Sequence, residues 1–318
     1  MSQKKITVIL FILIIIFSTF SLFIGAINIT QNTNNTIKSI DLLFISRLPR
    51  LLAILCTGSG MSVAGLVMQK LCMNKFISPT TGTTIASSQI GVLLSLLVFP
   101  HVSIITKTFI SFFTALVGTS IFIWFIQKIK LKNIIMLPLI GIMFGNIISA
   151  IINYYAYKYD VLQVLTASLT ADFSLILKGN YEIVFLVFPL IIVAYIYANH
   201  FNIVGMGEAF SKNIGLSYEK MLFLGFGIAS LITASVVVTV GTISYIGLIV
   251  PNIFLMFKGD KIQNSLVDIM LCGALFVLVC DIISRLVIYP YELPINLITG
   301  IIGSIIFVIL MYQRLKIT

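Results

Sequence analysis

Few side chains in this chain of 318 residues could perform chemistry, and they form no catalytic set. A nucleotide-binding phosphate loop needs a glycine followed directly by lysine, and that dipeptide occurs nowhere. The two histidines, His101 and His200, stand alone at the ends of apolar runs. The four cysteines lack the spacing of metal ligands or of a disulfide framework. The sequence therefore predicts a protein that is not an enzyme and has no cofactor or metal of its own.

Two carboxylates could still serve transport, because Asp268 and Asp281 flank the apolar segment 269–280. An ionisable group deep in a helix bundle can couple transport to a proton gradient. Asp281, however, precedes Arg285 by four residues, which is a pairing distance on a helix. An ion pair near the membrane surface is the simpler interpretation. Sodium coupling through backbone carbonyls stays open.

Two polar stretches interrupt the apolar sequence. Segment 200–220 interleaves charged residues with apolar ones three and four positions apart, which predicts a short amphipathic helix outside the lipid. It could dock a soluble partner or simply connect two spans. Segment 78–89 is rich in hydroxyl groups and leads into an apolar run. Such groups avoid lipid, so this segment is expected either to be buried in the bundle or to line a wet pathway.

The composition indicates whether the chain folds in water or in a lipid membrane. Hydrophobic residues make up 59% of the chain, charged residues only 9%, and the mean hydropathy is +1.13. A soluble globular domain carries about 25% charged residues. The chain is therefore an all-α polytopic membrane protein, which we expect to form one domain over residues 1–318. Its net charge of +10 is assigned to membrane loops and not to nucleic-acid binding.

Hydropathy predicts ten transmembrane helices with both termini in the cytoplasm. A span needs about 20 apolar residues, and the run 221–257 is too long for one, so we divide it at Gly241. The expected spans centre on 6–27, 51–69, 84–100, 108–126, 133–157, 183–199, the two halves of 221–257, 269–280 and 293–313. This topology places thirteen lysines and arginines inside and seven outside, as the positive-inside rule requires. Arg47, Arg50 and Arg285 fall outside against that bias and need an explanation.

Several motifs occur in order from the second span to the last, namely 47–50 (Arg-Leu-Pro-Arg), Gly58, Gly65, Gln69, Asn74, Pro79, 207–209 (Gly-Glu-Ala), Gly215, 241–251, 281–285, 292–295, Gly300 and Gly303. Together they resemble the motifs of permease subunits of ABC importers for iron–siderophore complexes, haem and vitamin B12. Segments 74–81 and 171–179 are most similar to permeases of Gram-positive bacteria for catecholate siderophores such as petrobactin.

The resemblance implies roles for three groups of residues. Arg47, Arg50 and Arg285 would dock a lipid-anchored siderophore-binding protein, although Arg285 could instead pair only with Asp281. The segment from about 200 to 220 would couple to a cytoplasmic ABC ATPase. Its expected contact residues are Gly207, Glu208, Ala209, Lys212 and Gly215. The hydroxyl-rich stretch is our candidate for the pathway lining, namely Thr80, Thr81, Thr83, Thr84, Ser87, Ser88 and Gln89.

The same resemblance implies the assembly. A second permease, either a paralogue or another copy, would complete the pathway in a bacterial plasma membrane. ATP hydrolysis would reside on the separate ATPase, and a ferric siderophore would pass into the cytoplasm unchanged. The alternative is an ion-coupled secondary transporter that works without an ATPase. A purely structural membrane subunit explains neither the outside arginines nor the long polar loop.

Overall fold

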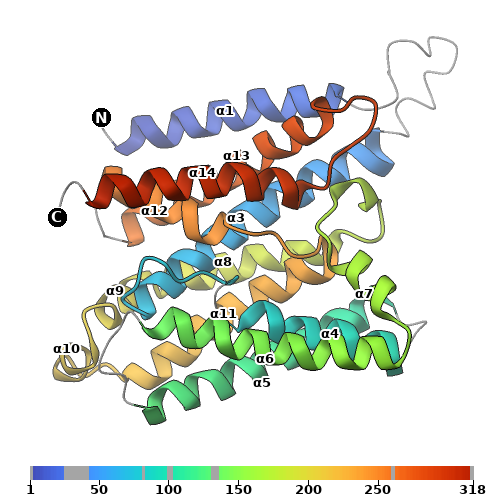
Figure 1. The fold of residues 1–318 in the computed structure, drawn as a ribbon. Helices are drawn as coiled ribbons and strands as arrows, with labels where there is room; N and C mark the ends of the chain where they lie inside the picture. The colour runs from blue at the N-terminus through green and yellow to red at the C-terminus, as the bar shows by residue number, and fades with distance from the viewer. Residues whose placement is uncertain are drawn as a thin grey trace, which may run out of the picture.

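The computed structural model describes residues 3–24, 43–80, 83–98, 103–129, 136–258 and 262–315. Almost all of these residues are helical, and the long helices lie side by side in one bundle (Figure 1). The long helices are α1 (Gln3–Phe23), α3 (Leu48–Leu71), α5 (Ile104–Ile129), α6 (Met136–Lys158), α11 (Tyr218–Thr239), α13 (Ile262–Leu286) and α14 (Ile295–Leu315). A π-helical turn, η2 (Leu43–Arg47), precedes α3.

Shorter helices complete the bundle and its two ends. They are α4 (Thr84–Val98), α7 (Leu162–Leu169), η3 (Phe173–Leu175), η4 (Glu182–Leu186), α8 (Val187–Ile196), α9 (Ala198–Val204), α10 (Glu208–Asn213) and α12 (Ile246–Lys258). Helix α10 lies at the end of the bundle where α1 begins and α14 ends, and we term this the inner end (Figure 1). Helix α7 lies at the opposite, outer end.

The helices follow the predicted apolar segments. Among the described residues, seven helices are long and apolar enough to cross a membrane, and the pair formed by 182–196 and 198–204, bent by 60°, would make an eighth. Helices α4 and α12 are shorter apolar segments. The division at Gly241 is confirmed, because this glycine separates α11 from α12 with a φ of +101°. The number of ten spans and the cytoplasmic termini stay predictions.

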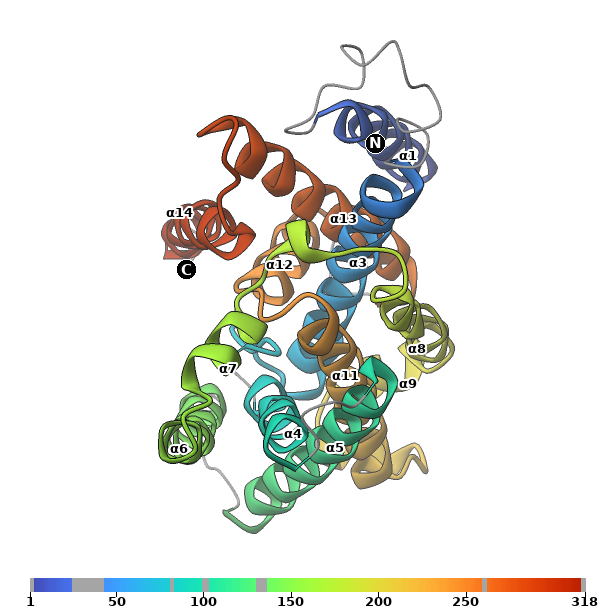
Figure 2. The same ribbon diagram turned by 90° about the vertical axis from the view of Figure 1, so that its right-hand side faces the viewer.

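Helix α3 is the interior element, because its neighbours approach its backbone closely. A Cβ atom on Gly58 would overlap the carbonyl oxygen of Gly273 in α13, and one on Gly65 would overlap that of Gly247 in α12. Such small residues let helices gain dispersion energy where lipid removes the hydrophobic driving force. Of the most apolar window of α3, 89% is buried, against 11% in α1, 17% in α6 and 22% in α14. The three exposed helices lie at the periphery (Figure 2).

Candidate functional site

A cluster of charged side chains lies at the outer end of α3 and α13. Asp281 has a fully buried side chain and receives two guanidinium groups. Arg50 Nη2 lies 2.7 Å from Asp281 Oδ1, while Arg285 pairs with Asp281 Oδ2. Arg50 Nη1 also reaches Glu292 Oε2, in the loop before α14, at 2.6 Å. The predicted pair of Asp281 and Arg285 is thus confirmed within a larger network that sequence spacing did not predict.

Arg285 of this cluster and the neighbouring Arg47 bind the outer end of α1. Arg285 Nη1 donates to the carbonyl oxygens of Ser21 and Ile24, each at 3.0 Å, and Arg47 Nη1 donates to Leu22 O at 2.6 Å. The last carbonyls of a helix have no partner within it and carry partial negative charge, so cations there are stabilising. Arg285 is consequently only 5% exposed, whereas Arg47 is partly exposed. The docking role of the three arginines remains a prediction.

The predicted amphipathic helix of segment 200–220 is confirmed as α10. Glycines with positive φ flank it, Gly207 at +107° and Gly215 at +83°, so only a residue without Cβ fits these turns easily. Lys212 Nζ lies 2.6 Å from Glu208 Oε1 one turn away, and this hydrogen bond raises the pKa of Lys212. The coupling role of Gly207, Glu208, Ala209, Lys212 and Gly215 stays a prediction.

The segment around α10 also presents apolar side chains to solvent. Met206, Phe210 and Ile214 follow one another at intervals of four residues and are 60%, 44% and 55% exposed. We term these three residues the inner apolar face. Nothing in the described part of the chain covers them, so a hydrophobic partner surface suits them.

The hydroxyl-rich stretch is mostly buried within the chain. Thr83, Thr84, Ser87 and Ser88 are at most 1% exposed, whereas Thr80 and Gln89 are partly exposed. The hydroxyl groups of Thr84 and Ser88 donate to Pro79 O and Ile85 O. Burial, one of the two outcomes expected for this stretch, is therefore confirmed for these four residues. Thr81 lies outside the described residues.

Helix α6 carries exposed amides that sequence analysis missed. Asn146, near its middle, and Asn153, two turns later, are exposed on one face of the helix, and no described residue hydrogen-bonds to either amide. An amide facing lipid at that depth has no hydrogen-bond partner and is costly. Helix α14 lies on the same side of the bundle as α6 (Figure 2). The sequence did contain a signal, which is an asparagine within an otherwise apolar segment. Averaging hydropathy over the whole segment conceals such a single polar residue.

The two carboxylates considered for ion coupling are both engaged. Asp268 Oδ1 accepts a hydrogen bond from Thr7 Oγ1 at 2.5 Å, and Asp281 is held by the two arginines. Within the described ranges, no three His, Cys, Asp or Glu side chains are grouped to hold a metal ion. The part of the chain described forms a bundle of apolar helices with a buried charge cluster at one end and an exposed short helix at the other.

Comparisons with known proteins agree with this architecture. Residues 7–313 match the model of the FecCD transport family. The petrobactin import system permease protein YclN of Bacillus subtilis is 47% identical over 272 residues, covering 86% of each chain. The ferric-anguibactin transport system permease protein FatD of Vibrio anguillarum is 35% identical, covering 85% of this chain and 86% of the relative. A solved structure described as an inward-facing metal-chelate type ABC transporter superposes with a TM-score of 0.81 at 25% identity, covering 98% of this chain and all of the other.

The charge cluster makes a prediction about stability. Replacing Asp281 with Asn removes the one carboxylate shared by two buried guanidinium groups, so we expect unfolding to become easier by about 3 to 5 kcal/mol. Glu292→Gln is the matched control, because this carboxylate is 25% exposed and serves Arg50 alone. Its loss should cost about 1 kcal/mol or less. Thermal unfolding in detergent measures both variants, and equal losses would contradict a central role for Asp281.

Proposed function

Because the chain belongs to the FecCD transport family, we propose that it is the permease subunit of an ATP-driven importer that carries a ferric siderophore across the bacterial plasma membrane. The observation that carries this proposal is the 47% identity, over 86% of both chains, to a permease named for petrobactin import. A second relative is named for ferric anguibactin. Within this class we propose a catecholate substrate of the petrobactin type, in a Gram-positive bacterium.

The importer needs an ATPase and a second permease beside this chain. We propose that the ATPase binds at the inner end, where α10 presents its ion pair and the inner apolar face. The positive-φ glycines turn the chain at either end of this short helix, and Ser211 Oγ ties it to Ile203 O of α9. A rigid helix docked in a groove of the ATPase would transmit the closure of the nucleotide-binding chains to α9 and α11.

Changing the inner apolar face tests this coupling. We expect Phe210→Asp to abolish stimulation of ATP hydrolysis by the siderophore-loaded binding protein, because a carboxylate would have to be desolvated in the interface. Asn213→Asp is the control, since it adds a carboxylate at an exposed position of the same helix outside the inner apolar face and should retain most of the stimulation. Hydrolysis and transport are measured in proteoliposomes containing the complete importer. Full stimulation of the Phe210 variant would contradict the assignment.

We propose that the outer end receives a lipid-anchored siderophore-binding protein. Arg47, beside the charge cluster, is partly exposed, Arg50 keeps 11% of its side chain exposed, and guanidinium groups form directional pairs with carboxylates. Arg50 Nη1 already donates to the carboxylate of Glu292. A carboxylate of the binding protein would replace Glu292 in this ion pair. Arg285 would contribute by holding Asp281 and α1 in place beneath them.

Charge reversal at Arg47 tests the docking surface. We expect Arg47→Glu to weaken binding of the siderophore-binding protein about tenfold or more, because an attractive pair becomes a repulsive one. Lys178→Glu makes the same charge change nearby, since Lys178 N donates to Ile45 O at 3.0 Å. If only the general potential mattered, both variants would weaken binding alike. Affinity is measured by surface plasmon resonance, with thermal unfolding as a check on folding.

We propose that the pathway runs along the side of the bundle formed by α6 and α14, against the second permease. Asn146 and Asn153 place amide groups on this face. In lipid these amides would have no hydrogen-bond partner, whereas in a wet pathway they could bind water or substrate. Helix α4 packs behind this face, where a Cβ atom on Gly145 would lie 4.0 Å from Ala86. Of the hydroxyl-rich stretch, Thr80 and Gln89 stay candidates for the lining, and the buried hydroxyls position α4.

Cysteine labelling distinguishes a wet face from a lipid-facing one. In a Cys272→Ser background, we expect Asn146→Cys to react with a water-soluble thiol reagent about tenfold faster than Ile151→Cys, because thiolate forms only in contact with water. Ile151 is the control, at a similar depth on another exposed part of α6. The remaining cysteines are buried. Equal, slow labelling of both variants in the assembled importer would contradict the proposed pathway.

A further inference from the structure

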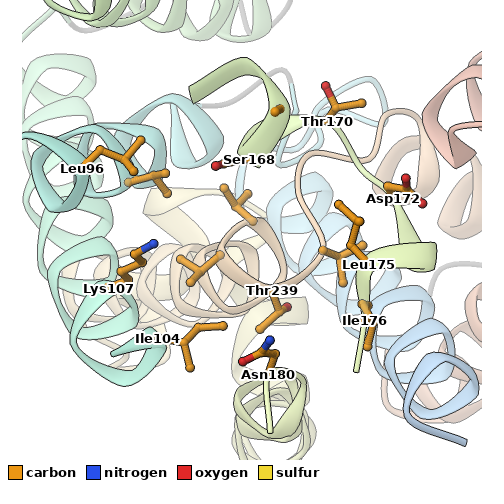
Figure 3. Close-up of a pocket in the computed structure, with 15 residues that line it drawn as sticks. Leu96, Ile104, Lys107, Ser168, Thr170, Asp172, Leu175, Ile176, Asn180 and Thr239 are labelled. Atoms are coloured by element: carbon orange, nitrogen blue, oxygen red, sulfur yellow. The ribbon is translucent and has the colours of Figure 1, made fainter. Parts of the chain in front are cut away.

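A cavity of about 400 Å³ lies at the outer end, apart from the charge cluster and the polar face of α6 (Figure 3). The outer parts of α4 and α5, the segment from α7 to η3, and the end of α11 form its walls. Aliphatic residues make up nine of its fifteen lining residues and polar or charged residues the other six, so the cavity can contact both apolar and polar groups of a small molecule. Its volume falls in the range of such sites, which is about 300 to 1,000 Å³.

Two opposite charges line this cavity without meeting. Lys107 of α5 and Asp172, just after α7, lie on opposite sides of the cavity (Figure 3). No ion pair joins them, and no described residue is hydrogen-bonded to the ammonium group of Lys107. Asp172 Oδ1 accepts from Ser174 N at 2.8 Å, which fixes the carboxylate and leaves Oδ2 without a described partner. Both groups are partly buried, so a ligand between them could satisfy both.

The hydroxyl groups of the cavity add directional chemistry. Ser168 Oγ and Thr170 Oγ1 each donate to a carbonyl one turn earlier, at 2.8 Å, and Thr239 Oγ1 does so at 2.7 Å. Their hydrogen atoms are therefore engaged, and each oxygen atom keeps lone pairs that could accept a hydrogen bond from a ligand. Together with Asp172, they favour N–H or O–H donors on one side of the cavity. Lys107 favours an anion on the other.

We propose that this cavity binds one arm of the ferric siderophore on its way into the pathway. The anionic edge of the arm, a catecholate or carboxylate, would lie on Lys107, and an amide or amine N–H would face Asp172 and the hydroxyl oxygens. The cavity is far larger than a single acidic side chain requires, which favours a small molecule over a contact of the binding protein. This inference rests on the proposed function, because a ferric siderophore supplies the ligand.

Direct binding tests the inference without transport. With the assembled importer in nanodiscs, we expect saturation-transfer NMR to detect dihydroxybenzoate, an anionic catechol. Lys107→Gln should weaken its binding about tenfold, which corresponds to one charge-assisted contact, and Lys107→Arg should preserve it. Lys178→Gln removes an exposed charge from the same end of the molecule and is the control. Unchanged binding by the Lys107→Gln variant would overturn the proposal.

Two further results would also overturn the inference. Equal binding of neutral dihydroxybenzyl alcohol would mean that the cavity does not select an anion. Displacement of dihydroxybenzoate by an equal concentration of phosphatidylglycerol would identify a lipid headgroup site instead.

Uptake of ferric petrobactin into proteoliposomes separates this inference from the proposed function. We expect Lys107→Gln and Asp172→Asn to raise KM about tenfold while kcat changes less than about twofold, because they remove substrate binding and not coupling. Asp172→Asn keeps an oxygen that can accept from Ser174 N, so the local fold is preserved. Normal KM values in both variants would refute the inference while the proposed function stands. No uptake by the unmodified importer would refute the siderophore assignment, while the binding assay still decides whether the cavity takes an anionic catechol.

Discussion

The carboxylate of Asp281 is the interaction on which the outer half of the bundle depends. It is fully buried, and it compensates two guanidinium groups that reach it from different helices. Through Arg285 it fixes the end of α1, through Arg50 it fixes the start of α3, and Arg50 continues to Glu292 before α14. Charges of this kind are retained in a membrane protein only when they satisfy one another. Four segments distant in sequence are joined in this way.

The interior of the bundle depends on a different constraint, which is the close approach of backbones. Glycines of α3 face glycines of α12 and α13 where no Cβ would fit. A polar side chain also joins α3 to α12, because Gln69 Nε2 donates to the carbonyl oxygens of Gly247 and Leu248. These contacts make α3 a fixed centre. The peripheral helices α6 and α14 keep exposed faces that can meet lipid, a second permease or a substrate.

The two ends of the molecule present different surfaces. The inner end offers a short helix with an apolar face, which suits a hydrophobic groove. The outer end offers arginines, a partly exposed glutamate and a cavity with separated charges, which suit carboxylates and an anionic chelate. Membership of the FecCD family agrees with this division, because an importer must receive its substrate outside and its driving force inside.

The sequence alone determined the solvent, the helices and the family. A chain with so few charges and such long apolar runs must fold in lipid. Gly241 marked the break between α11 and α12, because glycine has no Cβ and adopts a positive φ without steric cost. Only the tertiary structure decided how the arginines are used, because Glu292 lies far from Arg50 in sequence and the end of α1 lies far from Arg285. It also placed Asn146 on an exposed face and set Lys107 opposite Asp172, 65 positions away (172 − 107), across one cavity. Hydropathy measures one segment at a time, whereas a partner across the bundle depends on how the helices pack.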